Sequence, residues 1–216
     1  MISLRLNKSS NKPLVVLCLG CHSDDIEIGC GGTILRLIEE QQDCKFHWVV
    51  FSATGARKTE AQQAAKLFTG SERLNRLQLN EFRDGFLPFI AVEVKEAFEK
   101  LKEVTPDIIF THYGKDAHQD HRLISELTWN TFRNHLIFEY EIPKYDGDMG
   151  RPNFFVPLET RHYQKKIEHL MEAFVTQRSK SWFQPETFLG LMRLRGMECN
   201  ASSGYAEAFY TRKLVL

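Results

Sequence analysis

The sequence predicts an α/β fold in which helices cover both faces of a mostly parallel sheet. Short runs of apolar or β-branched residues alternate with longer segments whose apolar residues recur at helical spacing, which is typical of β-α units. The chain has 216 residues, 43% of them apolar, and no repeat or long linker divides it. We therefore expect a single domain over residues 1–216, with a flexible N-terminus at 1–12.

The expected strands are the short apolar runs. Residues 14–19 form a nearly continuous apolar run, as in a strand that is buried on both faces. The later runs are richer in β-branched and aromatic residues, which favour strands. In order, the expected strands are residues 14–19, 46–51, 77–82, 107–111 and 136–142.

Amphipathic segments between these runs are the expected helices, and we assign them to residues 33–42, 59–68, 90–104, 124–131 and 163–174. The second is expected to stop at Gly70 and the third before Pro106. The glycine-rich stretch 20–32 is predicted as a loop. Residues 143–158 are rich in turn-forming residues, so we expect a surface loop near the site.

Charge and composition exclude several classes of protein. Lys plus Arg equals Asp plus Glu at 28 each, so no net charge draws the chain to nucleic acid. The longest apolar run, 14–19, is too short for a membrane span and no cleavage site follows it. The cysteines are odd in number and unevenly spaced, and Cys18 of the Cys18-x-x-Cys21 motif lies in an apolar run, so we expect reduced thiols and a cytoplasmic protein.

Reactive side chains gather in two segments that follow expected strands. The first holds His22, Asp24 and Asp25, and the second, residues 111–121, holds His118 and His121. Ligands of open parallel sheets bind at the carboxyl ends of strands, so these segments should converge. Imidazole and carboxylate are ligands for Zn²⁺. His22 and Asp25 could bind one ion if the chain turns, and the third ligand would come from His118 or His121.

The same residues allow simpler interpretations. An aspartate after a strand commonly caps the next helix, so Asp24 or Asp25 could be a cap only. The glycines at 29, 31 and 32 could form a phosphate-binding turn, although the G-x-G-x-x-G spacing and a Walker lysine are both missing. The residue pattern alone leaves a metal site and a binding module both open.

Both segments resemble motifs of the PIG-L (LmbE-like) N-deacetylases. The family's first motif, His-Pro-Asp-Asp followed by Gly-Gly-Thr, is similar to residues 22–33, with Ser23 in place of the proline. Its second motif is similar to Asp116-x-His118-x-Asp120-His121. Shorter matches are Arg57-x-x-Glu60-Ala61, Asp84-Gly85-Phe86 and Tyr205-Ala206-Glu207-Ala208-Phe209.

The resemblance implies a Rossmann-like three-layer fold and a hydrolase that removes the N-acetyl group from an N-acetylglucosamine-type amino sugar or its glycoconjugate. Carried over position by position, it implies that one Zn²⁺ per chain, or Fe²⁺ or another divalent ion, is bound by His22, Asp25 and His121. Catalytic roles fall on Asp24 as general base, His118 as the group that stabilises the oxyanion or protonates the leaving amine, and Asp120, which would orient an imidazole. Arg57 and Asp84 would contact sugar hydroxyls.

Two rival functions remain open at this stage. One is another metallohydrolase on the same scaffold that cuts an amide or ester of a small metabolite. The other is a non-catalytic nucleotide- or sugar-binding module. The expected partner is a small molecule or glycoconjugate, with no nucleic acid and no membrane insertion, and a homo-oligomer is left open.

Overall fold

The computed structural model describes residues 12–41 and 43–215. The strands are β1 (Leu14–His22), β2 (Cys44–Ser52), β3 (Leu74–Leu79), β4 (Ile108–His112), β5 (Leu136–Tyr140), β6 (Phe154–Pro157) and β7 (Ala206–Tyr210). They form one seven-stranded sheet in the order β3-β2-β1-β4-β5-β7-β6. The N-terminus that we expected to be flexible lies, apart from residue 12, outside the described residues.

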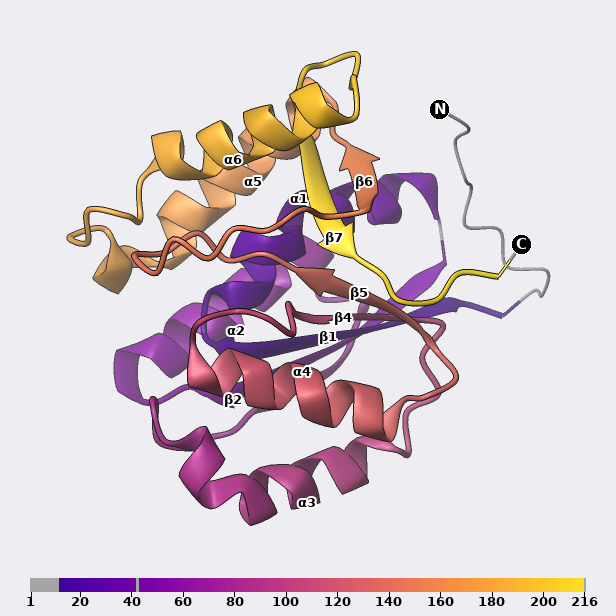
Figure 1. Cartoon of the computed structure of the whole chain (residues 1–216), viewed down its shortest axis with the longest axis vertical. Helices are drawn as coiled ribbons and strands as arrows, with labels where there is room; N and C mark the ends of the chain where they lie inside the picture. Colours follow the sequence, from indigo (N-terminus) through magenta and orange to yellow (C-terminus); the bar gives the residue numbers. More distant parts are fainter. Residues whose placement is uncertain (1–11, 42, 216) are drawn as a thin grey trace.

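Helices cover both faces of this sheet, as the sequence predicts. They are α1 (Asp25–Glu40), α2 (Gly55–Thr69), α3 (Ala91–Leu101), α4 (Gln119–Thr131), α5 (Thr160–Ala173) and α6 (Pro185–Glu198), with two short 3-10 helices, η1 (Leu87–Ile90) and η2 (Val175–Gln177). Helices α3 and α4 lie on one face, and α1, α5 and α6 lie on the other (Figure 1). The predicted α/β class is therefore confirmed.

The strand order places a site at one edge of the sheet. The first five strands pair in parallel, and the chain reverses its direction of winding between β1 and β4. Open sheets of this kind bind ligands at that switch point, beyond the carboxyl ends of the strands. Here β1 ends at His22 and β4 at His112. The last two strands were not predicted; β7 pairs antiparallel with both β5 and β6.

Several predicted boundaries are wrong, and the most important is the loop expected over residues 20–32. Strand β1 continues to His22 and helix α1 begins at Asp25, so Gly29, Gly31 and Gly32 lie within a helix. They are needed for close approach, since a Cβ atom on Gly29 would lie 2.2 Å from Cδ2 of Tyr140 on β5. Helix α4 likewise begins before the predicted residue 124, at Gln119.

The remaining corrections are smaller. Helix α2 begins at Gly55 and β3 at Leu74, each several residues earlier than predicted. The expected loop 143–158 contains β6 at its end. Helix α6 lies in a part of the chain to which we assigned no element from the sequence.

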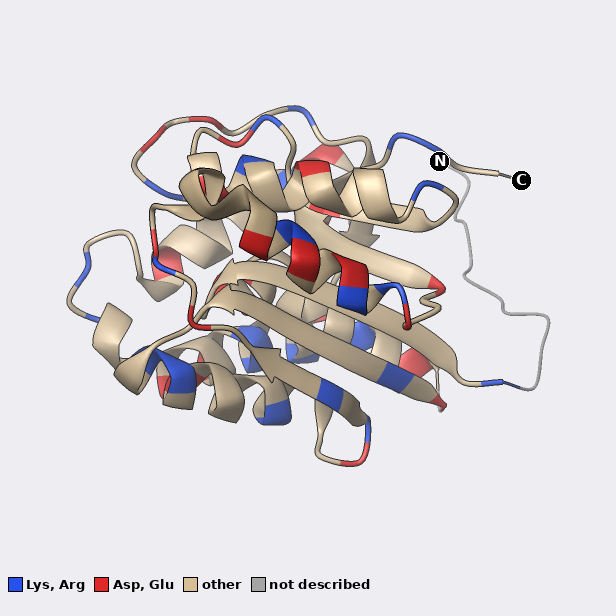
Figure 2. Ribbon diagram, turned by 90° about the horizontal axis from the view of Figure 1, so that it is seen from below, with Lys and Arg blue, Asp and Glu red and all other residues tan. Residues whose placement is uncertain are grey.

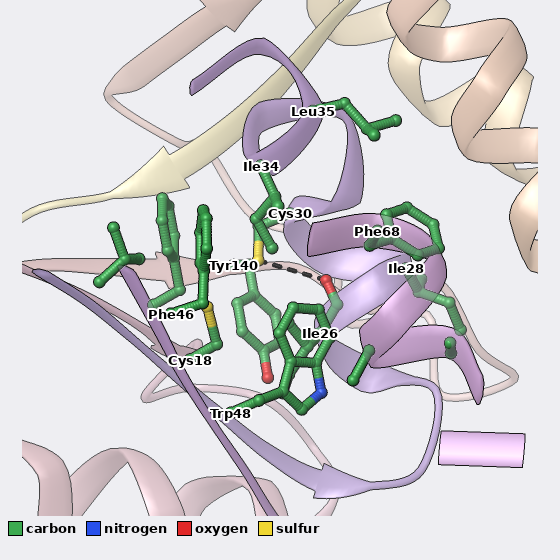
Figure 3. Close-up of a cluster of buried hydrophobic side chains, with 14 of the residues drawn as sticks. Cys18, Ile26, Ile28, Cys30, Ile34, Leu35, Phe46, Trp48, Phe68 and Tyr140 are labelled. Carbon is green, nitrogen blue, oxygen red and sulfur yellow. Dashed lines mark hydrogen bonds between the residues drawn. The ribbon is translucent and has the colours of Figure 1, made fainter. Parts of the chain in front are cut away.

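Helix α1 contributes a large share of the core between the sheet and its upper helical layer. Figure 3 shows Ile26, Cys30 and Ile34 of α1 directed toward Trp48 and Tyr140 from the sheet, and all five side chains are fully buried. The Cys30 thiol donates to the carbonyl of Ile26 at 3.2 Å. The first turns of α1 are therefore fixed to the strands beneath them.

Basic and acidic residues are interspersed over the helices and loops in the view of Figure 2. This distribution agrees with the zero net charge of the sequence. Within the described ranges, no helix is both long enough and apolar enough to cross a membrane.

Replacing Gly29 with alanine tests the close approach of α1 to the sheet. We expect Gly29→Ala to destabilise the fold by about 1–3 kcal/mol, because the new methyl group overlaps the Tyr140 ring and packing strain outweighs the gain in helix propensity. The matched control is Gly190→Ala in α6, where a Cβ meets no atom within 4 Å. That variant should be more stable by about 0.5–1 kcal/mol. Urea unfolding in the presence of a chelator measures both, and equal effects would contradict the packing argument.

Candidate active site

The turn from β1 into α1 brings the first group of functional side chains together. His22 is the last residue of β1, Asp24 is the N-cap of α1 and Asp25 is its first residue. The backbone amide of His22 donates to Asp25 Oδ2 at 2.6 Å, which folds the Asp25 side chain back toward the strand end. The side chains of His22 and Asp25, three residues apart in sequence, thereby come within 3.4 Å of each other.

His121 completes a triangle of possible metal ligands. The Nδ1 atom of His22 lies 3.1 Å from Nε2 of His121 and 3.4 Å from Oδ2 of Asp25, and Nε2 of His121 lies 3.6 Å from Oδ2 of Asp25. Tetrahedral zinc with ligand distances of about 2.0–2.1 Å holds its ligands about 3.3 Å apart. The residues present therefore fit a zinc ion by donor type and by spacing, with the side chains of Asp25 and His121 almost fully buried.

Each imidazole of the triangle has a carboxylate at its other nitrogen. Nε2 of His22 lies 2.9 Å from Oδ1 of Asp84, and Nδ1 of His121 lies 3.1 Å from Oδ2 of Asp116. With a metal bound, these carboxylates would hold each ring proton on the outer nitrogen and leave the inner lone pair for the ion. Burial, and then the neighbouring His112, lower the pKa of His121 to about 3, so its ring is neutral as a ligand must be.

The role expected for Asp120 is wrong in one respect. We predicted that Asp120 would orient an imidazole, but the structure gives that contact to Asp116. The carboxylate of Asp120 accepts from the backbone amides of Gly85 at 2.7 Å and Leu87 at 3.2 Å. Asp120 therefore fixes the segment that carries Asp84 beside His22.

Asp24 lies next to the triangle, as the N-cap of the helix that carries Asp25. Its Oδ1 accepts from the Arg57 guanidinium at 2.6 Å, while its Oδ2 is buried and has no hydrogen-bond partner among the described residues. Burial raises the pKa of Asp24, and the charge of Arg57 opposes that shift. An oriented carboxylate with one free oxygen is suited to accept a proton.

Arg57 is held between two carboxylates. It bonds Asp24 and also Glu60, at 3.0 Å, and Glu60 accepts from both the amide and the hydroxyl of Thr176 in η2 at 2.7 Å. The expected contact of Arg57 with sugar hydroxyls stays a prediction, since its bonds here are to the protein. Asp84, whose side chain is 72% exposed, is accessible to a substrate hydroxyl.

His118 lies at the rim of the site as the N-cap of α4. Its Nδ1 accepts from the amide of Asp120 at 3.3 Å, so in the neutral ring the proton is on Nε2. Burial, and then the charge of His22, lower the pKa of His118. The ring lies edge-on to His22 with centroids 5.0 Å apart, which places an N–H donor beside the ligand triangle.

Sequence reasoning placed His112 in the second reactive segment but gave it no role; it is the last residue of β4. It is fully buried, its Nε2 lies 3.2 Å from Asp25 Oδ2, and its ring stacks on His121 at 3.9 Å. Its place at the end of a strand beside β1 was the signal that could have found it. Cys21 is also near, but burial raises the pKa of its thiol to about 12, and its Sγ contacts the Nε2 side of His22.

Sequence comparison places this chain in a known family. The family model PIG-L, described as GlcNAc-PI de-N-acetylase, matches residues 17–132, more than half of the chain. The uncharacterized deacetylase YaiS of Escherichia coli is 26% identical over 154 residues, 64% of this chain and 79% of that protein. A diacetylchitobiose deacetylase of Thermococcus kodakarensis is 24% identical over 136 residues, 56% of this chain and 50% of that enzyme.

Solved structures share the fold. The conserved protein TT1542 from Thermus thermophilus superposes with a TM-score of 0.75 at 21% identity, covering 94% of this chain and 96% of that one. The N,N'-diacetylchitobiose deacetylase from Pyrococcus horikoshii superposes with a TM-score of 0.69 at 20% identity, and the match covers 92% of this chain and 83% of that one. The hydratase GalB from Pseudomonas putida also matches, with a TM-score of 0.69 at 17% identity over 94% of this chain and 98% of that one. Fold alone thus does not define the reaction.

The fold and the match to the family model together define a hydrolytic enzyme of the N-deacetylase class. The chain belongs to the PIG-L family. Members of this family are in general metal-dependent, and the described residues include a cluster that could hold an ion, namely His22, Asp25 and His121 with Cys21 beside them.

Two aspartate variants test the assignment of Asp116 and Asp120. We expect Asp116→Asn to weaken zinc binding by about 10–100-fold, because the carboxylate that polarises the His121 ring is lost. Asp120→Asn should lower the free energy of unfolding by about 1–3 kcal/mol, because one of the two amides loses its acceptor, with a smaller effect on zinc. Chelator competition and urea unfolding measure the two effects. A larger zinc defect in Asp120→Asn would restore the original assignment.

Proposed function

We propose that the protein is a zinc-dependent hydrolase that removes the N-acetyl group from an N-acetylglucosamine-type amino sugar or its glycoconjugate. The observation that carries this proposal is the triangle of His22 Nδ1, Asp25 Oδ2 and His121 Nε2, with the free oxygen of Asp24 beside it. The family match and the two diacetylchitobiose deacetylases among its relatives support the substrate class.

Zinc held by the three ligands would lower the pKa of a bound water to roughly 7 and polarise the substrate carbonyl. Fe²⁺ or another divalent ion with the same ligands would supply similar chemistry. The protein's own residues then determine where protons and charges go.

Asp24 is the proposed general base. Arg57 holds one carboxylate oxygen, so the other, Oδ2, points in a fixed direction and can take a proton from the attacking water. The bond between Arg57 and Glu60 keeps the guanidinium in place. Because the network is largely buried, its geometry costs little reorganisation when charge moves.

His118 is the residue proposed to stabilise the oxyanion or to protonate the leaving amine. Its Nε2–H can donate to the carbonyl oxygen as negative charge develops there. The water oxygen forms a bond to the carbonyl carbon, the C–N bond breaks, and the departing nitrogen receives the proton that Asp24 or His118 carries. The products are acetate and a free amine, and no covalent bond to the enzyme is needed.

Asp84 and Arg57 are the proposed contacts to sugar hydroxyls. Asp84 has most of its side chain in solvent while one oxygen faces His22. The proposed partner is a small molecule or glycoconjugate, and the zero net charge gives no support for nucleic acid. We also propose a cytoplasmic enzyme, which the free thiols at Cys18, Cys21, Cys30, Cys44 and Cys199 support.

Metal content and acetate release test the proposed function directly. Purified protein should hold about one zinc or iron per chain, His121→Ala should hold none, and N-acetylglucosamine or its glycosides should release acetate in a chelator-sensitive manner. Metal without acetate release from any N-acetylated sugar would favour another metallohydrolase. Sugar binding that ignores chelators, with no metal taken up, would favour the binding-module alternative.

Two variants separate the role of Asp24 from that of the metal ligands. We expect Asp24→Asn to retain zinc and to lose about 10²–10⁴-fold in kcat, since the general base is removed. His22→Ala should lose zinc itself, because one corner of the triangle is missing. Elemental analysis beside steady-state kinetics checks both, and equal zinc loss in the two variants would contradict the division of roles.

A further inference from the structure

The segment that follows β5 returns to the loop between β4 and α4. Lys144 lies just beyond the end of the sheet, and its side chain is only 12% exposed. Its ammonium nitrogen is 3.1 Å from Oδ2 of Asp116 and 2.6 Å from Oδ2 of Asp148. Asp148 Oδ2 also accepts from the backbone amide of Ala117 at 2.7 Å. Two side chains of the 143–158 segment therefore hold the loop that leads into α4.

Asp116 connects these contacts to the proposed metal site. Its Oδ2 faces both the Lys144 ammonium and Nδ1 of His121, each at 3.1 Å, and its Oδ1 accepts from the amide of His118 at 2.8 Å. The carboxylate is almost fully buried. Asp116 thus contacts both the proposed metal ligand His121 and the backbone of His118. The Lys144 ammonium in turn pairs with the Asp116 carboxylate.

We propose that Lys144 and Asp148 form a clamp that positions the 116–121 loop for metal binding. The proposal rests on the proposed function, in which His121 is a zinc ligand. In this proposal the 143–158 segment does not cover the substrate. Its role is to hold Asp116 and Ala117 at fixed distances from the end of β5. Lys144 and Asp148 are positioning residues, since neither contacts the ligand triangle.

The charges explain why the clamp acts on metal affinity. A buried carboxylate is costly unless cations or hydrogen-bond donors surround it. Without the ammonium, Asp116 would keep the His121 ring and one amide, and Asp148 would lose the cation that holds it over Ala117. The loop would then sample other arrangements, and His121 would be in the ligating position for a smaller fraction of the time.

Zinc affinity of matched variants tests the clamp. Lys144→Met and Asp148→Asn should each bind zinc about 10-fold more weakly than wild type in competition with a chromophoric chelator. The control is Lys115→Met, which removes the same charge next to Asp116 from an exposed side chain and should stay within about twofold of wild type. With saturating zinc, kcat of the two clamp variants should approach that of wild type with KM unchanged.

Each other outcome overturns the clamp. Unchanged zinc affinity in Lys144→Met and Asp148→Asn would make the segment a connector. Tighter zinc binding in Lys144→Met alone would mean that the positive charge of Lys144 only opposes the binding of the cation and does not position the loop. Thermal unfolding of the metal-free proteins guards against misfolding, and Asp148→Asn, a nearly isosteric change, decides the matter if Lys144→Met does not fold.

The same measurement separates this proposal from the proposed function. Zinc binding needs no substrate, so an affinity loss in both variants alongside a wild type that releases no acetate would support the clamp and refute the deacetylase. A wild type that takes up no zinc would refute both.

Discussion

The close approach of α1 to the sheet is the constraint on which the site depends. At Gly29 the helix passes so near Tyr140 that a Cβ atom would lie 2.2 Å from the ring. Asp24 and Asp25 belong to the first turn of that helix, one turn before Gly29. Any outward shift of α1 would therefore move both carboxylates relative to His121, which is carried by α4 on the opposite face of the sheet (Figure 1).

The last third of the chain holds α1 in that position. In a regular helix the carbonyl of Ile28 and the amide of Gly32 are partners, and here each also has a side-chain partner. Lys166 of α5 donates to the Ile28 carbonyl at 2.5 Å, and Glu207 of β7 accepts from the amides of Gly32 and Thr33. Lys166 and Glu207 pair with each other at 2.6 Å. Both members of this buried ion pair have further hydrogen-bond partners in the backbone of α1, which favours such a pair in a core.

Much of the fold and of the candidate site could be predicted from the sequence. Apolar periodicity located the first five strands, although not all their ends, and the motifs selected His22, Asp25 and His121, which the structure brings together. The glycines that suggested a loop lie in α1 because their reason is packing against Tyr140, which comes from a distant strand. Asp116 and Asp120 could not be distinguished from spacing, since both are near His121 in sequence. Only the direction of each side chain decides which of them meets the ring.

The two imidazoles of the triangle are supported in different ways, and the difference has consequences for substrate binding. His121 is backed by Asp116, whose side chain is 3% exposed and is itself held by Lys144. His22 is backed by Asp84, whose side chain is 72% exposed on a segment anchored through backbone contacts to Asp120. A substrate hydroxyl can reach Asp84 but not Asp116. A hydroxyl bound to Asp84 would therefore affect His22 through the carboxylate that they share. Asp116 is buried, so His121 would not be affected in this way.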